Sequence, residues 1–125
     1  MRGGGDRSRP QEGARALALA LRHWLERAPP GALPVTYRGL AQAFSLSPPG
    51  TIARVTQALE QLMVEDAAAG RPFIAAFVVS QSGTGMPGAG FFEHAVALSR
   101  FPAASELQKA AWEAEFARAR AFYGQ

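Results

Sequence analysis

Four polar residues recur at intervals of three or four residues in the middle of the chain: Thr51, Arg54, Gln57 and Gln61. In a helix, residues at such intervals lie along one side. An arginine can donate two hydrogen bonds to the edge of guanine, and a glutamine pairs with adenine in a similar way. This spacing therefore predicts a helix that enters the major groove of duplex DNA and reads bases with these side chains.

Three further groups of residues are expected to contact DNA around that helix. One arginine lies on the preceding helix, several polar side chains lie on a glycine-rich loop, and several arginines lie in a basic N-terminal segment. Cationic segments follow phosphate backbones and minor grooves without reading sequence. The members are Arg38 in the first group, Gln81, Ser82 and Thr84 in the second, and Arg2, Arg7 and Arg9 in the third.

Residues suited to enzyme chemistry are few. The chain has no cysteine and two histidines, His23 and His94, and neither stands at a recognisable spacing from a nucleophile or an acid. The glycines from Gly83 to Gly90 match neither the lysine-containing phosphate loop nor the dinucleotide-binding fingerprint. We therefore expect a protein that is not an enzyme and that uses no cofactor and no metal.

Composition and charge limit the class of protein. A length of 125 residues is typical of one domain. No apolar run approaches the roughly 20 residues that span a bilayer, and residues 1–10 lack the apolar core of a secretory signal, so we expect a cytoplasmic protein. The net charge is +3. All of this excess falls in residues 1–27, whereas residues 28–104 and 105–125 are each neutral.

The elements that must position these residues follow a helix-turn-helix pattern. Residues 1–12 lack periodic apolar residues and are expected to form a flexible basic tail. Leucines and Trp24 recur at helical spacing from Gly13 to Ala28 and predict a first helix. We then expect a short strand over 33–35, a helix over 37–44 capped by Thr36, a turn over 45–50, and a third helix that is capped by Thr51 and stops near Gly70.

A wing is expected after the third helix. The aromatic and β-branched run at 72–80 predicts a strand buried on both faces, and the glycine-rich segment 81–90 predicts the loop of the wing. Residues 91–98 favour a short helix, although a second strand over 89–92 is an alternative.

A last helix over 105–123 is predicted from a capping box formed by Ser105 and Gln108. Its wide aromatic stripe contains Trp112, Phe116, Phe122 and Tyr123 and suggests a homodimer through this helix.

Two segments carry a resemblance to a known family, VTYRGL at 35–40 and ARVTQAL at 53–59. They are similar to the winged-helix domain of alkylguanine-DNA alkyltransferases and of their catalytically dead relatives. The resemblance covers roughly residues 33–100 and implies a DNA-binding fold. The family's Pro-Cys-His-Arg or Pro-Trp-His-Arg box is replaced by Arg-Pro-Phe-Ile-Ala-Ala at 71–76, so the nucleophile and its histidine are absent.

Together these patterns predict a mainly α (α+β) fold, a winged helix-turn-helix with a short sheet, an N-terminal helix and a C-terminal helical extension, as one domain over 13–125. The expected function is DNA binding by a small regulator or accessory DNA factor of bacterial type, for example in transcription regulation. A protein-protein interaction module or adaptor is the alternative, because Glu60, Glu65 and Asp66 on or after the third helix would repel phosphate.

Overall fold

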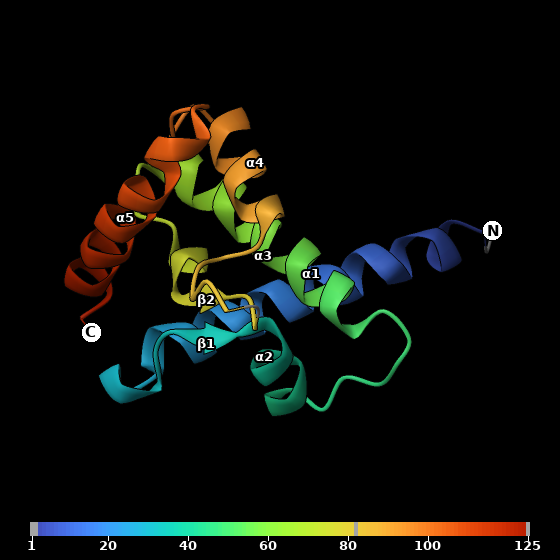
Figure 1. Ribbon diagram of the computed structural model, residues 1–125. Helices are drawn as coiled ribbons and strands as arrows, with labels where there is room; N and C mark the ends of the chain where they lie inside the picture. The colour runs from blue at the N-terminus through green and yellow to red at the C-terminus, as the bar shows by residue number, and fades with distance from the viewer. Residues whose placement is uncertain (1–2, 82, 125) are drawn as a thin grey trace.

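The computed structural model describes the backbone of residues 3–81 and 83–124 and the side chains of residues 13–81 and 83–124. The predicted fold class, mainly α with a short sheet, is confirmed (Figure 1). The described residues form α-helices α1 (Gly3–Arg27), α2 (Tyr37–Ala43), α3 (Thr51–Ala69), α4 (Ala89–Ala97) and α5 (Gln108–Tyr123), 3₁₀ helices η1 (Pro30–Ala32), η2 (Ile74–Phe77) and η3 (Ser105–Leu107), and strands β1 (Val35–Thr36) and β2 (Val78–Val79).

Helix α1 begins earlier than the apolar spacing predicts. It starts at Gly3, so the start expected at Gly13 is wrong, and residues 3–12, expected to form a flexible tail, continue the helix. A tail was expected because this segment has no apolar face that could stabilise a helix by packing. An extension of a helix already anchored by its buried leucines avoids the cost of nucleation, which falls on the first turn.

The helix-turn-helix is formed by α2 and α3, as predicted. Thr36 caps α2, because its Oγ1 accepts a hydrogen bond of 2.9 Å from the Gly39 amide. A Cβ at Gly39 would lie 3.1 Å from that same oxygen, so the glycine makes room for the cap and not for a neighbouring helix. Thr51 does not cap α3. The N-cap is Gly50 in the left-handed conformation (φ +73°), which ends the turn without a side-chain cap.

The segment 72–80 differs most from the prediction. Only Val78–Val79 is a strand, and it pairs in parallel with Val35–Thr36. The residues before it form η2, and every side chain from Phe73 to Val79 is buried. The apolar run correctly predicted burial on both sides, but a run without alternation does not distinguish a strand from a short helical turn. The α2–turn–α3 unit supplies the long crossover that a parallel pair requires.

Helix α4 takes the place of the second wing strand considered for residues 89–92. The loop between β2 and α4 is closed by a hydrogen bond of 2.8 Å from the Ser80 amide to the Met86 carbonyl. It therefore connects a strand to a helix, and the described residues contain no returning strand beside it.

Helix α5 covers η2 with the aromatic stripe that suggested a homodimer. Phe116 packs edge-to-face on Phe77 at 5.4 Å between ring centroids, and Trp112 Nε1 donates to the Ala76 carbonyl at 2.9 Å. Tyr123 donates to the Pro72 carbonyl at 2.9 Å. Only Phe122 of the stripe is exposed, so this argument for a homodimer no longer holds. The predicted capping box is also wrong, because η3 precedes α5 without a side-chain cap.

Two buried carboxylates hold the start of η2. Asp66 Oδ2 accepts from the Ile74 amide at 3.0 Å, and Glu115 Oε2 accepts from the Phe73 amide at 2.7 Å. Both carboxylates are fully buried. Their charges are balanced by arginines: Arg22 and Arg71 bind Asp66, and Arg100 and Arg118 bind Glu115.

Replacement of Asp66 by alanine is expected to lower the free energy of unfolding by about 3–5 kcal/mol, because it removes the buried partner of Arg22 and Arg71 and leaves Arg22 with only the exposed Glu65. The Ile74 amide would also lose its acceptor. Asp66→Asn, which keeps one acceptor oxygen, should cost less. Urea-induced unfolding followed by tryptophan fluorescence measures the loss.

The exposed Glu113→Ala change on α5 is the control, and should shift stability by about 0.5 kcal/mol or less. If Asp66→Ala behaved like Glu113→Ala, the buried network would not be what stabilises η2.

Candidate nucleic-acid interface

The N-terminal half of α3 presents the predicted base-reading residues to solvent. Arg54 and Gln57 are exposed and Thr51 is half-buried, whereas Val55 and Leu59 on the other side of the helix are buried. This arrangement follows from helical periodicity, because apolar residues at spacings of three and four turn one side of α3 into the core. Of the four residues expected on the outer face of this helix, Arg54 and Gln57 are exposed, whereas Glu60 and Gln61 are half-buried.

Arg54 and Gln57 border a groove shared with α1. This groove has a volume of about 370 Å³, and Gly13, Ala14 and Leu17 line its other side. Arg54 Nη1 lies 3.5 Å from the Ser47 carbonyl, at the limit of a hydrogen bond, so its guanidinium is not held firmly in place. The residues of α1 in this groove were missed by the sequence analysis, because only the packing of α1 against α3 brings them there.

Arg38 and Thr51 lie together on the other flank of the first turn of α3. They line a second groove of about 290 Å³ with residues of the helix-turn-helix turn, among them Ser45 and Pro48. No acidic residue lies in this first turn, and no side chain caps it. The partial positive charge of the helix N-terminus therefore has no anionic neighbour there.

The acidic residues of α3 are turned away from this end of the helix. Asp66 is fully buried, and Glu65 pairs with Arg22 at 3.2 Å. Glu60 faces α4, since its Oε2 lies 3.4 Å from the position of a Cβ on Gly90. Gln61 approaches Glu65 at 3.5 Å, so it lies in an acidic neighbourhood that Arg54 and Gln57 do not share. The repulsion of DNA phosphate expected from Glu60, Glu65 and Asp66 is therefore confined to the C-terminal half of α3 or removed by burial.

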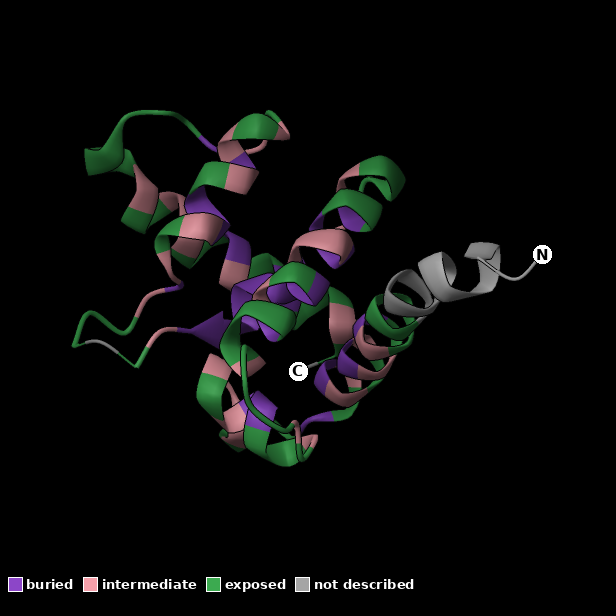
Figure 2. Cartoon of the chain, turned by 90° about the vertical axis from the view of Figure 1, so that its right-hand side faces the viewer, coloured by how far each residue is buried: buried purple, intermediate pink, exposed green. Residues whose placement is uncertain are grey.

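The loop residues do not join this surface. Gln81 and Thr84 are exposed, but the loop protrudes on the opposite side of the molecule from α1 (Figure 2). It is tied instead to α2, because the Gly88 amide donates to the Tyr37 hydroxyl at 3.0 Å. Arg2 and Ser82 lie outside the described residues, as do the side chains of Arg7 and Arg9.

The arginines divide into a set that pairs with buried carboxylates and a set that is exposed without an ion pair. Arg22, Arg71, Arg100 and Arg118 hold the two buried carboxylates. Six other cations are exposed and form no ion pair within residues 13–81 and 83–124, namely Arg15, Arg27, Arg38, Arg54, Lys109 and Arg120.

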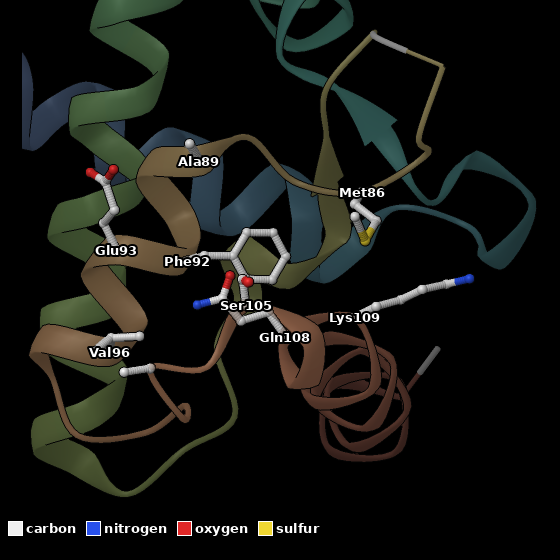
Figure 3. A pocket seen from close by; sticks show the side chains of 9 residues that line it. Met86, Ala89, Phe92, Glu93, Val96, Ser105, Gln108 and Lys109 are labelled. Atoms are coloured by element: carbon white, nitrogen blue, oxygen red, sulfur yellow. The ribbon is translucent and has the colours of Figure 1, made fainter.

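A larger groove lies between α4 and α5 and has a volume of about 590 Å³ (Figure 3). Phe92 lies at its centre, and the charged ends of Glu93 and Lys109 point away on opposite sides of that ring. Ser105 and Gln108 are the nearest polar side chains. These residues bring together no acid and base that could exchange a proton with one substrate atom.

The two histidines lie apart from this groove. His23 lines a groove beside Trp24, and His94 has a buried Nε2 without a hydrogen-bond partner among the described groups. No group of three potential metal ligands occurs in the described part of the chain.

Burial shifts the ionisation of three residues. Burial raises the pKa of Tyr37, and the nearby carboxylate of Glu60 raises it further. Burial and the charge of Asp66 likewise raise the pKa of Tyr123. For Arg22, burial acts to lower the pKa, but the charge of Asp66 and its hydrogen bond outweigh burial and raise it. Arg22 therefore stays charged within the core.

The chain matches no protein-family model, no curated protein sequence and no solved structure. The resemblance to alkyltransferase domains thus stays a prediction. Among the described residues, none of the helices combines the length and the apolar character that a membrane crossing needs.

Stability should fall as the pH rises above about 10. A tyrosine in an unfolded chain has a pKa near 10, and the fold raises the pKa of both Tyr37 and Tyr123. The folded chain therefore keeps these protons more tightly. The contribution of the two tyrosines to the free energy of unfolding is fully present below pH 10. It is lost as the pH rises through their higher pKa values in the folded chain.

Urea unfolding of the wild type and of Tyr37→Phe/Tyr123→Phe across this pH range measures the effect. The double variant should lose stability less steeply. Equal slopes for the two proteins would contradict the raised pKa values.

Proposed function

We propose that this protein binds duplex DNA through the N-terminal half of α3, as a small regulator or accessory DNA factor without enzymatic activity. The observation that carries the proposal is the division of α3 into two halves. Arg54 and Gln57 are exposed at one end, while the acids Glu65 and Asp66 at the other end are paired or buried.

The chemistry of this end suits a nucleic acid. In helix-turn-helix proteins, residues near the N-terminus of the second helix contact base edges in the major groove. Arg54 offers paired donors for guanine, and Gln57 offers a donor and an acceptor for adenine. Arg38 on the flank and the uncapped first turn of α3 suit phosphate oxygens on either side.

The resemblance to alkyltransferase-like domains supports binding without alkyl transfer. A helix-turn-helix, a glycine-containing loop and a helix follow one another in the order that the family has, although the segment before the loop is a 3₁₀ turn and a two-residue strand and not the family's extended segment. Phe73, within the segment where the family has its reactive box, is fully buried. Phenylalanine offers no nucleophile, so the proposal includes recognition of DNA but no reaction.

On a random-sequence duplex Arg54 is expected to neutralise a phosphate, because most such sites offer no guanine at the right position. Arg54→Ala should therefore weaken this binding and reduce the salt dependence of the affinity by about one phosphate contact, a change of roughly 0.9 in the slope of log K against log salt. Fluorescence anisotropy between about 50 and 200 mM salt measures both quantities. Gln57→Ala should leave the slope unchanged, because a neutral side chain releases no counterion, and should lower the preference among selected sequences.

Arg120→Ala is the matched control, since it removes from α5 an exposed arginine that forms no ion pair among the described residues and lies near the Phe116 ring. If Arg54→Ala and Arg120→Ala changed the affinity equally, general charge and not α3 would explain binding. Absence of binding by the wild type at about 50 mM salt would disprove the proposal.

A further inference from the structure

A groove at the C-terminal end of α1 lies apart from the α3 surface. It has a volume of about 530 Å³, and its lining comes from the last two turns of α1, from Pro29 and from Phe44 at the end of α2. It shares no lining residue with the groove beside Arg54 and Gln57, although Leu17 of that groove and Ala20 of this one are only about 4.5 Å apart along α1. The groove is therefore a separate surface and not a continuation of the proposed DNA interface.

The groove combines an aromatic floor with one exposed arginine at its rim. Trp24 and Phe44 are half-buried, and both pack against the hydrophobic core. His23 and Arg27 are exposed, and no acidic residue lines the groove. Tryptophan, phenylalanine and arginine are the residue types enriched in the centres of protein interfaces, whereas lysine and acidic residues are depleted there.

We propose that this groove docks an acidic peptide segment of a partner protein that carries a bulky apolar side chain. The apolar side chain would lie between Trp24 and Phe44, where it removes apolar surface from water. A carboxylate next to it would accept two hydrogen bonds from the guanidinium of Arg27, which forms no ion pair among the described residues. His23 lines the same groove.

Charge complementarity favours an acidic peptide over a nucleic acid. Single-stranded nucleic acids bind to grooves in which a row of cations follows successive phosphates. This groove has one arginine and one histidine beside a mainly apolar lining of Ala20, Ala28, Pro29 and the two aromatic rings. A peptide that carries one anionic group next to one large apolar side chain fits this lining.

Selection of a phage-displayed library of random short peptides against the full chain tests this proposal. The enriched peptides should contain tryptophan, phenylalanine or leucine next to aspartate or glutamate. Fluorescence anisotropy with an enriched peptide then measures affinity, and Arg27→Glu should weaken it by about tenfold or more. Trp24→Ala should also weaken it, with circular dichroism to check that the variant folds.

Arg120→Glu on α5 reverses another exposed, unpaired arginine and should leave peptide affinity unchanged. Failure to enrich acidic peptides, or enriched peptides that bind Arg27→Glu as well as the wild type, would overturn the proposal. Displacement of the peptide by single-stranded oligothymidine at equal concentration would also overturn it, in favour of a nucleic-acid site.

Discussion

The fold depends on two carboxylates that bind consecutive amides at the start of η2. The first amides of a 3₁₀ turn have no acceptor within the turn, and water cannot reach them when the turn lies in the core. An unpaired buried amide costs about as much as a lost hydrogen bond. Asp66 from α3 and Glu115 from α5 supply the acceptors. Because Glu115 is distant in sequence from α3, this pair fixes α5 against the helix-turn-helix.

The same carboxylates determine where the arginines lie. Two buried negative charges are tolerated only with close partners, and four arginines provide them. Arg22 joins α1 to α3 in this way, and Arg100 lies 4.3 Å from the centre of the Phe73 ring, so it adds a cation–π contact. A sequence count treats these arginines as available for phosphate and Asp66 as an opposing charge. In the structure Asp66 is buried and all four arginines are engaged by the two buried carboxylates, so the DNA proposal depends on Arg38, Arg54 and Gln57.

The parts of the structure that could be predicted from sequence are those with a local cause. The helix-turn-helix followed from apolar spacing, the Thr36 cap from its position before Tyr37, and the end of α3 at Gly70 from the left-handed conformation that glycine adopts easily (φ +71°). The exposure of Arg54 and Gln57 followed from the same periodicity.

The remaining features have tertiary causes. No local pattern marks Asp66 as a core residue, because its role depends on Arg22 and on the Ile74 amide. The run 72–80 forms η2 and not a long strand because carboxylates and not a neighbouring strand satisfy its first amides. The groove beside Arg54 exists only where α1 packs on α3. Side-chain burial, and not residue type, separates the candidate site from the core.

Helix α1 connects the two proposed surfaces, and its anchoring determines whether they can communicate. Its Gly13–Leu17 segment borders Arg54, and its last turns form the aromatic groove. Between them Leu21 and Leu25 are fully buried, and Arg22 binds Asp66 at 2.8 Å. Coupling between sites requires an element with two arrangements that ligands can bias. Because Leu21 and the Arg22–Asp66 ion pair hold α1 in place between the two segments, we expect DNA and a peptide to bind independently.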